Sequence, residues 1–116
     1  RGLGDVYKRQ DLNSYLIKHP AATFFVRAEG QSMIGAHIQS GDLLIVDRSI
    51  TPTHGKIVIA AIQGELTVKR LFCQNGVVQL HPENPEFPIL DISENSELVI
   101  WGVVTHIIHA AHLCSP

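Results

Sequence analysis

The sequence predicts a mostly β protein, built as a compact twisted barrel-like sheet of about seven short strands. Short apolar runs rich in β-branched residues recur along the chain, separated by turn signals such as Asn75-Gly76. Only one short stretch, at 12–18, favours a helix. The chain has 116 residues, of which 45% are hydrophobic and 17% charged. These values are those of one ordinary folded domain.

Each element follows from its local pattern. Asp11 is expected to cap a helix over Leu12–Lys18, and His19-Pro20 should end it. Prolines predict a loop over residues 81–88, and Gly102 predicts a bulge or bend in the last strand. The predicted strands are 23–28, 43–46, 56–62, 65–72, 77–80 and 97–108. Gly64 joins the third and fourth into a hairpin, and Asn75-Gly76 joins the fourth and fifth.

Charge divides the chain into two parts. The formal net charge is −2, with +2 on residues 1–10 and −4 on the remaining 106 residues. We therefore expect residues 1–10 to be a leader that does not match the rest of the chain, followed by one domain at 11–116. The domain lacks the clustered Lys and Arg that phosphate contacts require, which predicts little direct DNA binding.

The expected location is the cytoplasm. No apolar run approaches the ~18–20 residues of a membrane span. The two cysteines, Cys73 and Cys114, are too few for a disulfide scaffold and indicate a reducing compartment.

Ser32 is a candidate nucleophile. Gly30 permits a tight backbone just before it, and Ser32 followed by Met33 and Ile34 is typical of the start of a helical turn. Backbone N–H groups at such a turn point toward whatever approaches the hydroxyl, which is the geometry an oxyanion needs. The alternative is that Ser32 is only a helix cap.

Lys69 is the candidate base for that nucleophile. Strand alternation places Thr67, Lys69 and Leu71 on one face of 65–72. Partial burial there would lower the pKa of the Lys69 amine, and a neutral amine is a competent general base. Arg70 cannot serve, because a guanidinium does not deprotonate in proteins. The alternative is an ordinary surface lysine whose stem lies along the sheet.

Two other chemistries have weaker patterns. His106, His109 and His112 recur every third residue and, with Cys114, suggest a zinc site, but a solvated tail explains them as well. Cys73 with His81 suggests a thiol peptidase, although a lone cysteine after a strand is more often a small buried apolar residue. We expect no metal and no cofactor.

Several ordered motifs together resemble the LexA/UmuD family of self-cleaving Ser-Lys peptidases, and its UmuD-like branch most. The matching segments are Ala28–Met33, Ser40–Asp47, Thr67–Arg70, Leu80–Pro85 and Gly102–Val104. Ordered motifs at family spacing are more specific than any one of them alone. The resemblance covers about residues 11–110 and implies the family's fold.

The resemblance implies that Ser32 is the nucleophile, Lys69 the general base and the Met33 backbone an oxyanion support. It also implies a scissile Ala-Gly or Cys-Gly bond in the protein's own N-terminal arm. No such dipeptide precedes Ser32, so the chain resembles a processed or truncated form. Gln31 stands where UmuD-like relatives commonly have an aspartate. The lack of a helix-turn-helix argues against a LexA-type repressor.

The partners implied are a second copy of the chain, a RecA–single-stranded-DNA filament as activator, and a UmuC-like error-prone polymerase catalytic subunit. A homodimer is also expected because the apolar strand Leu98–Ile108 would need cover along its edge. Two alternatives to this interpretation stay open. The first is a catalytically idle dimeric accessory subunit. The second is the C-terminal self-cleavage domain of a phage-type repressor.

Overall fold

The computed structural model describes residues 9–93 and 97–111, with side chains from Leu12 onward. A helix, α1 (Arg9–Leu16), leads into a sheet, and two short 3-10 helices, η1 (Pro20–Ala22) and η2 (Ile34–Ala36), flank the first strand. The strands are β1 (Thr23–Arg27), β2 (Leu43–Asp47), β3 (Ile57–Ile62), β4 (Glu65–Gln74), β5 (Val77–His81), β6 (Leu90–Asp91) and β7 (Leu98–Ile108).

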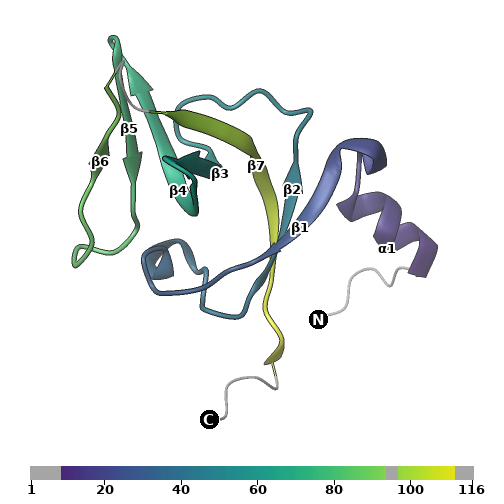
Figure 1. The fold of residues 1–116 in the computed structure, drawn as a ribbon. Helices are drawn as coiled ribbons and strands as arrows, with labels where there is room; N and C mark the ends of the chain where they lie inside the picture. The colour runs from purple at the N-terminus through teal and green to yellow at the C-terminus, as the bar shows by residue number, and fades with distance from the viewer. Residues whose placement is uncertain (1–8, 94–96, 112–116) are drawn as a thin grey trace.

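The described strands form one antiparallel sheet in the order β1-β2-β7-β3-β4-β5-β6. Figure 1 shows β7 as a long curved strand through the middle, with α1 near β1 at one end and β4 to β6 at the other. The predicted mostly β class is confirmed. The two-residue strand β6, which pairs with β5, was not predicted.

Both predicted hairpins are present. The chain turns between β3 and β4 at Gln63-Gly64 and between β4 and β5 at Asn75-Gly76, and all four residues have positive φ. Two successive left-handed residues twist a tight turn in the direction of the strands it joins. These turns fix the register of β4, the strand that carries Lys69.

The helix lies closer to the N-terminus than predicted. It begins at Arg9, inside the predicted leader, and ends at Leu16 rather than at Lys18. Asp11 is therefore a residue of the helix and not its cap. The end follows from Pro20, since the residue before a proline avoids the helical region and His19 has φ −133° and ψ 79°. Residues 1–8 lie outside the described part, so the leader itself stays a prediction.

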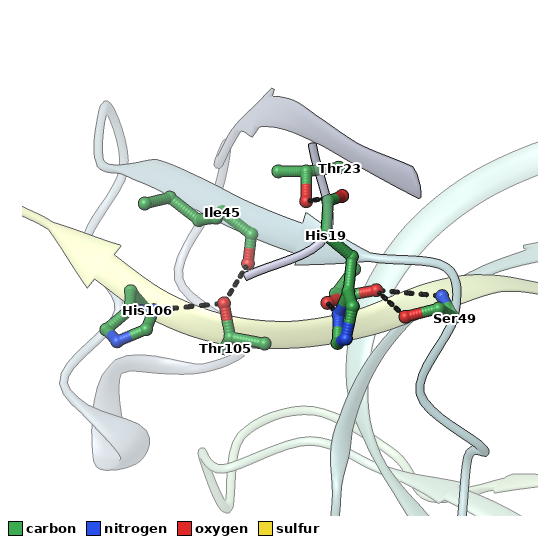
Figure 2. A network of polar contacts seen from close by, with 7 residues as sticks. His19, Thr23, Ile45, Ser49, Thr105 and His106 are labelled. Carbon is green, nitrogen blue, oxygen red and sulfur yellow. Dashed lines mark hydrogen bonds and ion pairs between the residues drawn. The ribbon is translucent and has the colours of Figure 1, made fainter. Parts of the chain in front are cut away.

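Two bulges bend β7. Ile59 pairs with Gly102 and Ala60 with Ile100, which leaves Trp101 as an extra residue and confirms the bulge expected at Gly102. Opposite β2, the pairing skips Thr105, whose hydroxyl donates to the Ile45 carbonyl at 3.3 Å (Figure 2). Gly102 also lies against β2, because a Cβ there would stand 2.6 Å from Val46 Cγ1.

The argument for dimerisation from the edge of β7 holds only in part. Along one edge of β7, β2 pairs with residues 103–108, and along the other edge β3 pairs with residues 98–103. Among the described strands β7 is therefore central, yet residues 98–102 on the β2 side and 104–108 on the β3 side have no strand partner. The outer strands of the sheet are β1 and β6.

Buried side chains form two clusters that share β3. Ile59 belongs to a cluster with Leu44, Val46 and Met33, whereas Val58 and Ala60 belong to a second cluster with Leu80. A strand buried on both faces needs a continuous apolar run, which is what residues 57–62 provide. The first cluster anchors the segment that follows β1, which contains Ser32.

Each end of β2 carries a buried aspartate paired with a histidine. Asp47 Oδ2 lies 2.6 Å from His19 Nδ1, and its Oδ1 accepts hydrogen bonds from the Ser49 hydroxyl and backbone (Figure 2). Asp42 Oδ1 lies 2.7 Å from His109 Nδ1. Burial alone would raise the pKa of Asp47, but the hydrogen bonds from His19 and Ser49 together lower it below its usual value. These pairs attach the segments before β1 and after β7 to β2.

Candidate functional site

Ser32 and Lys69 meet in the structure, although they are 37 residues apart. Lys69 Nζ donates a hydrogen bond to Ser32 Oγ at 3.1 Å. This lies within the distance over which a base can take a proton from a nucleophile. The pair joins the segment after β1 to the middle of β4.

Lys69 is held by its own strand. Its Nζ also donates to Thr67 Oγ1 at 2.6 Å and to the Val68 carbonyl at 3.2 Å. The contact between Thr67 and Lys69 confirms that strand alternation places both on one face. With 8% of its surface exposed, Lys69 is buried rather than an ordinary surface lysine.

Burial lowers the pKa of Lys69 below that of a free lysine. Desolvation disfavours the ammonium, and its three hydrogen-bond acceptors are neutral oxygens. Among the described residues, no carboxylate forms an ion pair with Lys69 that would stabilise its charge. The group is therefore shifted toward the neutral amine that a general base requires.

The local structure at Ser32 differs from a capped helix. Gly30 has φ 83°, the left-handed conformation anticipated for a tight backbone at this point. The helical turn that follows is η2, whose N-cap is Met33 with no side-chain hydrogen bond. Ser32 is therefore not a helix cap, and its hydroxyl is bonded to Lys69. The Met33 side chain is 2% exposed and belongs to the core, which leaves only its backbone for the site.

A cleft of about 260 Å³ lies beside Ser32. One side is the end of β1 and the segment after it, residues 26–29, and the other is the start of β4, residues 66–68. Leu44 and Ile59 line it as well. The cleft is thus bordered by two extended segments and has a mixed lining, in which Arg27, Glu29, Ser32 and Thr67 lie among apolar residues. This shape suits an extended peptide.

The loop over residues 81–88 packs against the Ser32 segment. The Glu83 N–H donates to the Ser32 carbonyl at 2.7 Å, and the Gly35 N–H donates to the Glu83 carbonyl at 2.7 Å. Asn84 Nδ2 donates to the Gln31 carbonyl at 2.9 Å. A Cβ on Gly35 would stand 2.5 Å from the Glu83 carbonyl oxygen, so only glycine permits this approach.

Reasoning from the sequence did not identify Thr67, Gly35, Glu83 or Asn84 as parts of the site. For Asn84 a signal was present, because it lies in the Leu80–Pro85 stretch that carries the family resemblance. For Thr67 the signal was its position two residues before Lys69 on the same strand face. Glu83 and Gly35 act through their backbones, which sequence patterns do not report.

The two other chemistries gain no support from the geometry. His81 pairs with Arg70 across β4 and β5, three residues from Cys73, and the alternation places the two side chains on opposite faces of the sheet. Cys73 is exposed rather than buried, contrary to the expectation for a lone cysteine.

For zinc, His109 is occupied by Asp42, and His106 Nδ1 lies 3.0 Å from the Thr105 hydroxyl. His112 and Cys114 lie outside the described residues. Within the described part, no group of three or more His, Cys, Asp or Glu side chains is arranged to hold a metal.

Comparison with known proteins identifies the family. The family model described as Peptidase S24-like matches residues 4–105. The chain belongs to this family.

Individual members of the S24-like family and their relatives agree with the resemblance seen in the sequence. Protein ImpA of Escherichia coli is 55% identical over 100 residues, covering 85% of this chain and 67% of ImpA. Protein MucA of Salmonella typhimurium is 48% identical over 103 residues, covering 86% and 70%. The LexA repressor of Bordetella pertussis is 38% identical over 90 residues, covering 78% and 42%. The assignment to the LexA/UmuD family, in its UmuD-like branch, is confirmed.

This S24-like chain has, among its described residues, no helix that is both long and apolar enough to cross a membrane.

Proposed function

We propose that this UmuD-like SOS-mutagenesis protein cleaves its own N-terminal arm, with Ser32 as nucleophile and Lys69 as general base. The observation that carries the proposal is the 3.1 Å contact between Ser32 Oγ and the buried Lys69 amine. It occurs in a chain of a peptidase family, at the two positions that the resemblance seen in the sequence implies.

Catalysis begins when the neutral Lys69 amine accepts the Ser32 hydroxyl proton. Ser32 Oγ then bonds to the carbonyl carbon of the scissile peptide, and the carbonyl electron pair moves to its oxygen. The Met33 backbone N–H supports the oxyanion. Collapse of this intermediate breaks the C–N bond, and the Lys69 ammonium protonates the leaving amine. Water, deprotonated by Lys69, hydrolyses the resulting ester.

The cleft between residues 26–29 and 66–68 is the place for the arm. A peptide laid between the two extended segments would present its scissile bond next to Ser32. Only an extended segment can reach the hydroxyl there, which favours a flexible arm over a folded substrate. An Ala-Gly or Cys-Gly bond has the small side chains that such a confined position tolerates.

The family resemblance supports the partners of the reaction and of its product. A RecA–single-stranded-DNA filament promotes cleavage, and the processed homodimer serves a UmuC-like polymerase catalytic subunit in error-prone synthesis. The acidic body leaves DNA contact to these partners. Exposed apolar side chains on β1 and β7, namely Phe25, Val99 and Trp101, provide surface for a second copy.

The relatives and the contact at Ser32 weigh against the two alternatives. An idle accessory subunit has no need for a buried lysine bonded to the serine. A repressor is the weaker match, since the chain is 38% identical to the LexA repressor but 55% identical to ImpA and 48% identical to MucA.

The test uses the protein preceded by an arm that contains an Ala-Gly bond. Self-cleavage is expected to accelerate as pH rises and to level off above the lowered pKa of Lys69, because only the neutral amine accepts the proton. Ser32→Ala and Lys69→Arg should each abolish cleavage, and their defects should not add, since the pair acts as one unit. Chelators should have no effect.

The control is Lys56→Arg, which makes the same change at an exposed lysine and should leave cleavage unchanged. Retention of cleavage by Lys69→Arg would contradict the assignment of the base, and retention by Ser32→Ala would contradict that of the nucleophile.

A further inference from the structure

Asn84 binds the backbone just before the proposed nucleophile. Its side chain is 9% exposed and donates from Nδ2 to the Gln31 carbonyl, while its Oδ1 accepts from the Glu86 N–H at 3.0 Å. Both functions of the amide are therefore used. An aspartate would keep the acceptor but would place a second oxygen against the carbonyl of Gln31.

The bond from Asn84 controls more than one atom. The Gln31 carbonyl and the Ser32 N–H belong to the same peptide group, which is planar and trans. Holding the oxygen at one edge of this plane therefore fixes the direction of the N–H at the opposite edge. Within the described residues the Ser32 N–H donates to no acceptor, so it is free to donate a hydrogen bond to a substrate.

The next peptide group is held in the same manner. The Glu83 N–H donates to the Ser32 carbonyl. The carbonyl before the Ser32 Cα is therefore bound by Asn84, and the carbonyl after it is bound by Glu83. The position of the Ser32 Cα and the direction of its side chain follow from these two planes. The only hydrogen-bond partner of Ser32 Oγ among the described residues is Lys69.

The loop itself is tied to the strand of the base. Arg70 follows Lys69 in β4, and its Nε donates to Glu83 Oε2 at 3.0 Å. Arg70 Nη1 also donates to the Gly55 carbonyl at 2.6 Å. The backbone at Ser32 is thus linked by contacts through Asn84 and Glu83 to Arg70, which is next to Lys69.

We propose that Asn84 is a positioning residue for Ser32. By holding the Gln31 carbonyl, it aims the Ser32 N–H at the oxygen on which negative charge develops and keeps Ser32 Oγ within reach of Lys69. This inference rests on the proposed function, because it assigns a role to Asn84 in the reaction of Ser32. Sub-ångström placement of nucleophile and oxyanion donors is what such reactions require.

The experiment measures how fast an alkyl fluorophosphonate labels Ser32, in the full chain and across a range of pH. In this reaction Oγ bonds to phosphorus, fluoride leaves with the P–F electron pair, and Lys69 takes the hydroxyl proton. Asn84→Asp should lower the plateau rate roughly 10–100-fold, less than the ~100–1,000-fold that follows loss of an oxyanion-hole donor itself, because the Ser32 N–H is misaimed and not removed. The pH midpoint should rise at the same time, because the new carboxylate near the site stabilises the Lys69 ammonium.

Leu90→Ala is the matched control, since it removes core packing near the same loop without a contact to the Ser32 segment. It should lower the melting temperature and leave the labelling rate of the folded protein unchanged. An equal loss of labelling in Leu90→Ala, or wild-type labelling in Asn84→Asp, would overturn the proposal.

A second measurement separates this inference from the proposed function. In ¹H–¹⁵N spectra, Asn84→Asp should shift or broaden the Ser32 amide resonance, whereas Leu90→Ala should not. A wild-type protein that resists labelling while its Ser32 amide responds to Asn84→Asp would overturn the peptidase mechanism and support the positioning. An unresponsive amide would overturn the positioning alone.

Discussion

The Lys69 amine sits between two hydroxyl groups, Ser32 Oγ at 3.1 Å and Thr67 Oγ1 at 2.6 Å. A lysine side chain has four rotatable bonds and loses much entropy when it is held in one place. The Thr67 hydroxyl holds the amine at a second point. It also stabilises the ammonium more than the neutral amine, because the ammonium is the stronger donor.

Replacing Thr67 with valine keeps the shape and removes this acceptor. Self-cleavage of the arm-bearing protein should fall roughly tenfold at its plateau, equivalent to about 1.4 kcal/mol. The pH midpoint should move down, because the ammonium loses an acceptor. The measurement is the rate of arm loss against pH. Thr23→Val, which removes the hydrogen bond to the His19 carbonyl, is the control and should keep the wild-type profile.

At this scale the sequence predicted the pair better than its surroundings. Ser32 and Lys69 were found from a tight turn, strand alternation and motif spacing. Asn84 contacts Gln31 from 53 residues away, and the contact depends on the path of a proline-rich loop. Nothing in the local pattern of either residue specifies that path.

Among the elements, β2 depends on the charge at its ends. Asp47 has a lowered pKa, so between the folded pKa and the unfolded value of 3.8 the unfolded chain binds more protons. The Asp47 carboxylate therefore contributes stability that is present above pH 3.8 and is lost as pH falls through the folded pKa. The segments attached through it are η1 and the turn at Ser49.

Asp47→Asn should therefore destabilise the protein at pH 7 by roughly 1–3 kcal/mol, the range for a buried charged hydrogen-bonding group. The difference in unfolding free energy between variant and wild type should shrink as pH falls from 3.8 through the folded pKa of Asp47. Urea unfolding at pH 7 and pH 3 measures both quantities. Asp91→Asn, at an exposed carboxylate bonded to Gln79, should change little at either pH. An equal loss at both pH values would contradict the role of the charge.

Element types were more predictable than element ends. The hairpin turns depend on two residues each, and Gln63-Gly64 and Asn75-Gly76 adopt the positive φ they require. The short strand β6 depends instead on its pairing with β5. Two residues such as Leu90 and Asp91 carry no period from which a strand could be predicted.

For the molecule as a whole, β7 approaches β2 closely at Gly102. A Cβ at this position would meet Val46 Cγ1 at 2.6 Å and the Asp47 carbonyl oxygen at 3.2 Å. Val46 is fully buried and has no room to move. The strain would fall on the strand that pairs with both parts of the sheet.

Gly102→Ala should accordingly lower the free energy of unfolding by roughly 1–3 kcal/mol, as overpacking does in a close-packed interior. Urea unfolding monitored by circular dichroism measures the change. Val99→Ala, at an exposed position of the same strand, is the control and should cost less than 1 kcal/mol, as surface substitutions usually do. A Gly102→Ala protein as stable as wild type would contradict the close approach.

The sequence predicted the class of the molecule but not the order of its strands. Alternation and turns reveal strands one at a time, whereas the neighbours of β7 are β2 and β3, far away in the chain. The expectation that Leu98–Ile108 has an edge in need of cover followed from its length and apolar character. It holds only in part, because long-range pairing places the strand at the centre and covers about half of each edge.

The central position of β7 has a consequence for the newly made chain. Strands β1 and β2, with the segment that holds Ser32, form one part of the sheet, and β3 to β6, with Lys69, form the other. Among the described strands, only β7 pairs with strands of both parts. A ribosome must therefore release residue 108 before the sheet closes, and pairings over such sequence distances form late. The nascent protein would remain inert toward its own arm until its last strand is in place.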